Sequence, residues 1–324
     1  MTVNTTHTLT RPERPAVIAG TKPRRGCAAG DAVLAYLRIQ AHTLNTLESA
    51  VRADRFDSVH QMRVATRRLR AAFRTFGQII PPGDSEHLTA ELHWLGRELG
   101  QARDAEVLAA HLRESLQPTP PELLIGPVQA RVQGYFAPRR AAARAALLEA
   151  LDSPRYTRLL TELDRVTAGP ARGPLAGAPA RDVLPAAVRH AFGQAKRRMR
   201  RARHTPAGPA RDAALHQVRK SARRARYAAE AASLAAPGKQ ARRFARQMKK
   251  VQSVLGDQHD AVLARQAARD LGIGAHLAGE NAFTYGLLQE REHQYAERRQ
   301  AEARHVWRRA ARPRHRRWMN TAAG

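Results

Sequence analysis

The sequence predicts an all-α protein built from two helical bundles that pack as a pseudo-symmetric pair. Apolar residues recur at spacings of three and four along most of the chain, and no convincing period-two strand pattern interrupts them. Charged residues and glycines of the first half return in the second half at a constant offset of 156 residues. Such in-phase repetition indicates a duplicated structural module. A Gly/Pro/Ala-rich stretch at 168–179, which cannot hold a helix, connects the two halves.

Residues that begin or end helices divide the first half into elements. The helices that the sequence predicts there cover residues 31–52, 58–76, 85–99 and 104–117. Ser58 is a suitable N-cap, Gly77 closes the second helix, and Gly100 separates the third helix from the fourth. Residues 122–168 also have a helical pattern, which Pro138 and Pro154 are expected to interrupt.

The second half follows the same plan, without a counterpart of residues 122–168. Its predicted helices cover residues 182–203, 211–235, 238–255, 258–271 and 279–310. The domain organisation that the sequence predicts is a disordered segment at 1–29, an N-terminal bundle at 30–170, a linker at 171–181, a C-terminal bundle at 182–311 and a basic tail at 312–324.

The charge of the chain indicates an anionic partner. Its 324 residues include 56 Lys and Arg against 28 Asp and Glu, a formal net charge of +28. Polyanions are the partners that compensate such a positive potential. Between residues 183 and 256 there are 19 basic residues and only two acidic ones. The second half is therefore expected to dominate binding, so that alanine at Arg219 and Arg223 weakens it more than alanine at Arg63 and Arg67.

The location that the sequence predicts is the cytoplasm. Cys27 is the single cysteine, which excludes an internal disulfide framework and fits a reducing compartment. The first residues lack the apolar core of a secretory signal, and no apolar run reaches membrane-spanning length. No membrane partner is expected, and the oligomeric state stays open.

Basic residues form stripes on several predicted helices. On a helical wheel, Arg63, Arg67, Arg70 and Arg74 share one side with His60, and Met62, Leu69 and Phe73 lie opposite. The candidate anion-binding residues, drawn from this stripe, its repeat and two neighbouring helices, are His60, Arg63, Arg67, Arg70, Arg74, Lys196, Arg200, His216, Arg219, Lys220, Arg223, Arg226, Arg246 and Lys249. The alternative is a set of solvated helix faces. Uncompensated like charges one turn apart cost roughly 0.2 to 0.5 kcal/mol per pair, which favours a ligand that relieves the repulsion.

Two further kinds of residue recur beside the arginines. His60 and His216 are either structural or donors to phosphate, and in the second case binding should strengthen as the pH falls through about 6.5. Asp104 and Asp260 each follow a Leu-Gly pair. They are either first-turn acids that favour the helix dipole or supporting residues that orient arginines of a facing helix.

The repeated segments resemble the signature of the CHAD family, the conserved-histidine α-helical domain. They read VHQMRVATRRLRAAFRTF at 59–76 and LHQVRKSARRARYAAEAAS at 215–233, followed by LGQARDAEVL at 99–108 and LGDQHDAVLA at 255–264. The resemblance covers roughly residues 30–310. It implies two four-helix bundles related by pseudo-two-fold symmetry, with a basic groove between them that binds inorganic polyphosphate.

The same resemblance implies which residues contact the ligand. The positions carried over are His60, Arg63, Arg67, Arg70, His216, Arg219, Arg223 and Arg226. The second copy departs from the pattern at His259, which stands where the first copy has an arginine before Asp104. No E-x-E-x-K strand of the triphosphate-tunnel domain that often accompanies this family is present, so the chain resembles the stand-alone form.

The predicted function is non-catalytic binding of inorganic polyphosphate, with targeting to polyphosphate granules as one role. The alternative is sequence-independent binding of nucleic-acid phosphates, which the small aromatic content, 5%, disfavours for single strands. An enzyme is not expected, because the sequence has neither a phosphate-binding G-x-x-x-x-G-K-[ST] loop nor a carboxylate cluster for magnesium. No cofactor is expected, and arginines around the motif histidines disfavour a metal site.

Overall fold

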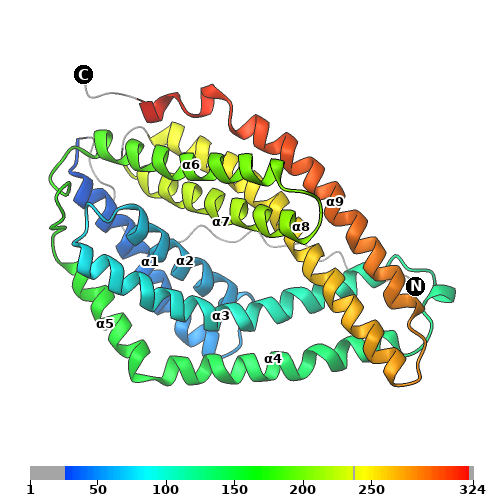
Figure 1. The fold of residues 1–324 in the computed structure, drawn as a ribbon. Coiled ribbons are helices and arrows are strands. Elements are labelled where there is room, and N and C mark those ends of the chain that lie inside the picture. Colours follow the sequence, from blue (N-terminus) through cyan, green and yellow to red (C-terminus); the bar gives the residue numbers. More distant parts are fainter. Residues whose placement is uncertain (1–25, 236–237, 321–324) are drawn as a thin grey trace, which may run out of the picture.

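The computed structural model describes residues 26–235 and 238–320, and this part of the chain is all-α, as predicted (Figure 1). The described residues form the helices α1 (Ala29–Arg52), α2 (Ser58–Thr75), α3 (Pro82–Leu116), α4 (Val128–Asp152), α5 (Pro154–Ala168), α6 (Ala180–His204), α7 (Pro209–Ala232), α8 (Gly238–Leu277) and α9 (Phe283–Ala310). Three short 3-10 helices accompany them, and within these residues the only β-type pairing is one isolated bridge between Ala28 and Pro179. Residues 1–25 of the predicted disordered segment 1–29, and the last four residues of the predicted basic tail, lie outside the described residues.

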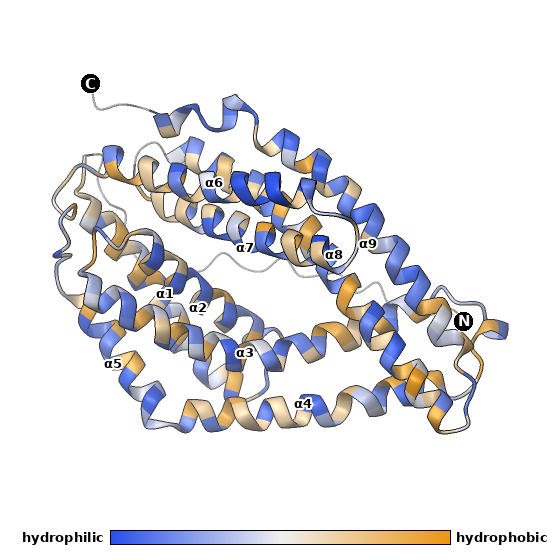
Figure 2. Cartoon of the chain, in the orientation of Figure 1, coloured by the Kyte–Doolittle hydropathy of each residue, from blue (hydrophilic) through white to orange (hydrophobic). Residues whose placement is uncertain are grey.

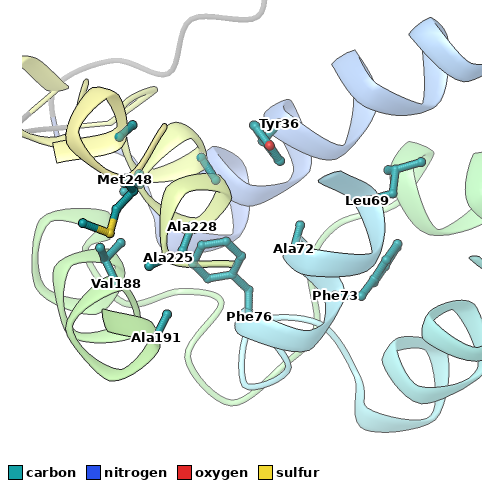
Figure 3. Close-up of a cluster of buried hydrophobic side chains, with 14 of the residues drawn as sticks. Tyr36, Leu69, Ala72, Phe73, Phe76, Val188, Ala191, Ala225, Ala228 and Met248 are labelled. Atoms are coloured by element: carbon teal, nitrogen blue, oxygen red, sulfur yellow. The ribbon is translucent and has the colours of Figure 1, made fainter. Parts of the chain in front are cut away.

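The helices form two groups, α1 to α5 and α6 to α9, and most helix packing occurs within a group (Figure 1). The groups meet where α1 and α2 contact α6 and α7, and where α3 contacts α8. One hydrophobic core runs through both groups. Figure 3 shows part of this core, to which Phe76, just after α2, and Ala225 of α7 both belong. The two halves are therefore joined by shared apolar packing, which fixes α2 against α7.

The amphipathic character predicted for the repeated helices is confirmed. Met62, Leu69 and Phe73 of α2 are fully buried, and so are Val218 and Ala225 of α7. Burial of a Val, Leu, Phe or Met side chain contributes about 1.5 to 3 kcal/mol. In Figure 2 hydrophilic residues predominate along α9. The apolar sides of α2 and α7 thus hold these helices in the core and leave their basic sides for other contacts.

The predicted helix breaks at Gly100 and Gly256 are wrong. Helix α3 continues through Gly100, and α8 continues through Gly256. A glycine inside a helix costs only about 0.5 to 1 kcal/mol relative to alanine. At both positions an arginine side chain packs against the helix, because a Cβ atom would lie 3.5 Å from Nη2 of Arg63 at Gly100 and 3.5 Å from Nε of Arg219 at Gly256. These glycines therefore lie inside continuous helices, in ordinary contact with an arginine side chain, and do not end them.

Two other element predictions need correction. Asp104 and Asp260 lie in the middle of α3 and α8, so the interpretation as first-turn acids is wrong. Pro138 lies inside α4 and does not interrupt it, whereas Pro154 begins α5. The mid-helix position of both aspartates leaves their side chains available to the helix that packs alongside.

The second halves of the long helices α3 and α8 extend beyond α2 and α7 and meet α4 and α9 in a separate hydrophobic cluster (Figure 1). Its buried members include Leu112, Phe136, Leu271 and Leu288. At the opposite end, the chain after α9 turns back in two short 3-10 helices and buries Trp318 near Phe244, with ring centroids 6.4 Å apart. The described part of the predicted basic tail is therefore packed on the second group.

Candidate anion-binding site

The basic sides of α2 and α7 approach one another where the two helices pack together. Burial, together with repulsion from Arg67, Arg219 and Arg70, lowers the pKa of Arg223 to about 9. Burial likewise lowers the pKa of Arg67, with Arg63 and Arg219 adding to the effect. A guanidinium keeps its proton at neutral pH even with such shifts. The arginines therefore stay charged and continue to repel one another, which leaves a positive potential at this junction. A bound anion would relieve the repulsion.

We call the residues at this junction the central cluster, which comprises Arg67, Arg70, Arg219, Lys220 and Arg223. Among the described residues, none of the five forms an ion pair with a carboxylate. The Nε atoms of Arg67 and Arg219 are buried without a hydrogen-bond partner in the described part of the chain. Buried donors normally find partners, and an unmet one costs about 1 to 3 kcal/mol. The central cluster is thus short of acceptors as well as of negative charge.

The two copies differ in how a carboxylate supports the cluster. Arg63 donates to Asp104 through both terminal nitrogens, with Nη1–Oδ1 2.7 Å and Nη2–Oδ2 3.3 Å. Asp104 therefore orients an arginine of the facing helix, which was the second of the two roles considered for it. At the repeated position, burial raises the pKa of Asp260 while Arg219 opposes that shift. Arg63 is accordingly neutralised, whereas Arg219 stays without an ion pair.

Arg226 does not join the central cluster, although the helical wheel placed it there. Its Nε lies 2.7 Å from Oε1 of Glu230, and Nε of Arg68 lies 3.0 Å from Oε2 of the same carboxylate. Arg226 also donates to the side chain of Gln252 at 3.2 Å. Glu230 stands where the first copy has Arg74. This substitution turns the end of the second stripe into an ion-pair network that connects α2, α7 and α8.

The motif histidines are neutral in the free protein. Burial lowers the pKa of His216 to about 3, and the adjacent His259 ring, 4.1 Å away between centroids, contributes next. Burial and then Arg219 lower the pKa of His259 to about 4. Burial also lowers the pKa of His60, although Asp57 opposes the shift. Binding that strengthens as the pH falls through about 6.5 therefore requires a bound anion to raise the pKa of these histidines.

The depressed histidine pKa values predict a loss of stability in acid. Between pH 6.5 and about 4, the unfolded chain binds protons at His216 and His259 that the folded chain does not bind, so the free energy of unfolding falls as the pH falls. Urea denaturation of the free protein from pH 7 to pH 4 measures this slope. The double variant H216Q/H259Q should have a shallower slope. Identical slopes for the two proteins would contradict the assignment.

Several side chains around the cluster were not found from the sequence. Arg198 of α6 donates to Oγ of Ser221 at 2.6 Å, and Arg224 of α7 donates to Oε1 of Gln194 at 2.7 Å. Burial lowers the pKa of Arg224 to about 10, with Arg74, Arg198 and Arg70 as the next causes. The repeat does mark Arg224, the counterpart of Arg68, but no sequence signal distinguishes Arg198 from the other arginines of α6.

Four predicted site residues lie elsewhere. Lys196 and Arg200 of α6 are exposed, and each is two residues, about 200° of helix rotation, from Arg198, which faces α7. Their neighbour Arg203 lines a small cavity with Arg304 of α9. The other two predicted residues, also exposed and outside the contacts of the central cluster, are Arg246 and Lys249 of α8.

Residues 26–235 and 238–320 contain neither a metal-binding cluster nor a membrane-spanning helix. No cluster of three or more His, Cys, Asp or Glu side chains there is arranged to hold a metal ion. None of the helices in that part of the chain combines the length and apolar character needed to cross a membrane.

The chain is similar to proteins of one family. The family model described as CHAD domain matches residues 35–269. Two curated relatives from Mycobacterium tuberculosis, named uncharacterized proteins MT2285 and Rv2226, are each 34% identical over 264 residues, which cover 80% of this chain and 49% of the relative. The chain thus spans about half the length of the curated relatives it matches.

Two solved structures share the fold. PptA from Streptomyces chartreusis has a TM-score of 0.71 at 20% identity, covering 87% of this chain and 99% of that one. The CHAD domain from the plant Ricinus communis has a TM-score of 0.66 at 26% identity, covering 97% of this chain and 98% of that one. Both comparisons agree with the all-α architecture described above.

Proposed function

Because this chain belongs to the CHAD family, we propose that it binds inorganic polyphosphate through the central cluster and catalyses no reaction on it. The observation that supports this proposal most is the set of five cations on α2 and α7 that have no carboxylate partner among the described residues. Planar guanidinium groups bind phosphate oxygens in bidentate fashion. A linear polymer of phosphates supplies both the negative charge and the acceptors that the cluster lacks.

In this proposal the polymer lies between the two groups of helices, along the basic sides of α2 and α7. Arg67, Arg70, Arg219, Lys220 and Arg223 contact it directly, and His60, Arg63, Arg74 and His216 border it. Asp104 holds Arg63 in place, and Asp260 supports Arg219 through its charge without an ion pair. Lys196, Arg200, Arg246 and Lys249 come into contact only with chains long enough to leave the cluster. Arg226 serves the ion-pair network.

A bound polymer should also change the charge of the histidines. Phosphates beside His216 and His259 favour the imidazolium form, so binding at pH 5 is expected to take up protons, whereas binding at pH 8 is not. Titration calorimetry in two buffers with different ionisation enthalpies measures this uptake. No uptake at pH 5 would show that the phosphates bind away from these rings.

Binding to nucleic acid is the second candidate function, and the cluster has few features that favour it. Single-strand binding proteins use exposed aromatic rings on which bases stack. Tyr227 is the aromatic residue nearest the cluster, and it is buried, with Arg68 and Arg226 within 5.7 Å and 5.4 Å of its ring centroid. No base can stack on that ring without displacing these arginines.

The proposal is tested by titration calorimetry with phosphate oligomers of defined length, beside an oligonucleotide with the same number of phosphates. At equal salt concentration, the phosphate oligomer is expected to bind at least about 10-fold more tightly. Its affinity should decrease as the salt concentration rises, because protein cations that bind the phosphates release counterions condensed on the polymer. Equal affinities would contradict a dedicated polyphosphate site. Release of phosphate from the oligomer by the pure protein would contradict the absence of catalysis.

Binding of this kind would bring the protein to cytoplasmic polyphosphate granules. Polyphosphate binding by the central cluster requires no cofactor, since the ligand supplies the negative charge and the hydrogen-bond acceptors. Granule association is a proposal of its own, and co-localisation of the tagged chain with polyphosphate staining, lost in a strain without polyphosphate, is the expected result.

A further inference from the structure

A cavity of about 650 Å³ lies beside the central cluster, between the end of α2 and the first half of α6. Its volume is in the range of pockets that bind small organic ligands, roughly 300 to 1,000 Å³. Phe76 and Ile79, both buried, contribute an apolar floor, and Val183 and Ala187 of α6 continue it. Inorganic polyphosphate has no apolar part that could use such a surface.

The polar groups of the cavity are separated along α6. Arg224 and Gln194 lie together, since Arg224 donates to Gln194 at 2.7 Å, and Asp182 lines the cavity in the first turn of α6. Twelve residues of helix separate Asp182 from Gln194, a distance of about 18 Å. The cavity therefore has a cationic end, a largely apolar middle that includes His190, and an end formed by the carboxylate of Asp182, which lies 3.8 Å from Nε of Arg181.

The cationic end is continuous with the central cluster. Arg74 lines the cavity together with Arg224, and neither forms an ion pair within the described residues. After burial, Arg74, Arg198 and Arg70 are the causes that lower the pKa of Arg224. An anionic group at this end would relieve the repulsion among these cations.

One polar atom of the cavity wall has no partner. The hydroxyl of Thr75 is buried and makes no hydrogen bond within the described part of the chain. On the facing side, Nε2 of Gln194 lies 3.0 Å from Nε2 of His190. The wall thus presents the Gln194 amide and the His190 imidazole to a ligand that has donors and acceptors of its own, with the Thr75 hydroxyl buried in the same wall.

We propose that this cavity binds a nucleoside di- or triphosphate, with the phosphates at Arg74 and Arg224 and the nucleoside on the apolar floor toward Asp182. The carboxylate of Asp182 is suited to accept hydrogen bonds from ribose hydroxyls or a base amino group. A phosphorylated lipid fits less well, because its acyl chains would meet an acidic side chain at the far end. The proposal rests on the proposed function only in that both use the cations that extend from Arg70 to Arg74.

The test compares ATP with inorganic tripolyphosphate, which has the same number of phosphates and no nucleoside. By titration calorimetry at equal salt without added metal, ATP is expected to bind the wild-type chain at least about 10-fold more tightly. The variant A187F, which fills the floor, should reduce ATP affinity to that of tripolyphosphate and leave the affinities for tripolyphosphate and long polyphosphate unchanged. The matched control A301F changes an exposed alanine of α9 and should alter none of these affinities.

A second variant avoids the risk that phenylalanine disturbs the packing of α6. D182N should weaken ATP about 5-fold and leave tripolyphosphate unaffected. Equal affinities of the wild-type chain for ATP and tripolyphosphate, or ATP binding that both variants leave intact, would overturn the nucleotide site. The proposed function fails separately, if long polyphosphate does not bind. In that case ATP binding that depends on Ala187 would still support the cavity.

Discussion

The double variant R67Q/R223Q is expected to bind polyphosphate at least about 100-fold more weakly than the wild-type chain. Each arginine forms charge-assisted hydrogen bonds to phosphate in the proposed complex, and such bonds contribute about 1.5 to 3 kcal/mol each. Two of them therefore account for a factor of about 100 or more. The same variant should be more stable than the wild type without ligand, because it removes the repulsion that lowers the pKa of both side chains. Titration calorimetry and urea denaturation measure the two effects.

The matched control is K196Q/R200Q, which removes the same charge from exposed positions on the outer side of α6. It should weaken binding of short oligomers less than about 3-fold and leave stability nearly unchanged. Equal losses of affinity for the two double variants would show that net charge alone governs binding and that the central cluster is not a specific binding site.

The single variants revise the expectation drawn from charge counts. Arg67 and Arg223 meet in one cluster, so their loss should have similar effects, although they belong to different halves. Alanine at Arg63 should matter less than alanine at Arg219, because Asp104 already neutralises Arg63. The net charge of each half is therefore a poorer predictor of an arginine's contribution to binding than the presence of a carboxylate partner.

The variant E230Q is expected to lower the free energy of unfolding by about 3 to 5 kcal/mol. Glu230 accepts hydrogen bonds from Arg68 and Arg226, whose side chains are 24% and 15% exposed. Removal of one partner from a buried ion pair leaves an uncompensated charge and costs about this much. Here two cations lose their partner, and α2 loses a link to α7. Chemical denaturation of the variant and the wild type at pH 7 measures the difference.

The control for this prediction is E302Q on α9. Glu302 also pairs with an arginine, Arg299, but its side chain is 46% exposed. Solvent-exposed pairs contribute about 0 to 1 kcal/mol, so this variant should stay within that range. If E230Q were no more destabilising than E302Q, the network around Glu230 would not be a stabilising connection between the halves.

The fold class and the buried faces of the repeated helices followed from local sequence patterns. The extent of α3 and α8 did not, because the sequence alone does not distinguish a glycine that ends a helix from a glycine that lies inside one, as Gly100 and Gly256 do. In the structure both glycines lie inside a continuous helix, where Arg63 and Arg219 pack against them. That contact depends on helix packing, which a helical wheel does not describe.

The same limit applies to the site. The stripes on α2 and α7 were predicted, but their meeting at Arg67 and Arg223 depends on how the two halves dock. A wheel for α6 places many arginines on its polar side and cannot tell that Arg198, rather than Arg200, faces α7. Nor does the repeat reveal that Glu230 neutralises Arg226, because the first copy has an arginine at the corresponding place.

A crystal structure of the chain with a short phosphate oligomer tests the central claim most directly. The account predicts phosphate oxygens within hydrogen-bond distance of both Arg67 and Arg223, so that one polymer contacts α2 and α7 together. Phosphates found only on the outer sides of α6 and α8, with the central cluster unoccupied, would contradict it.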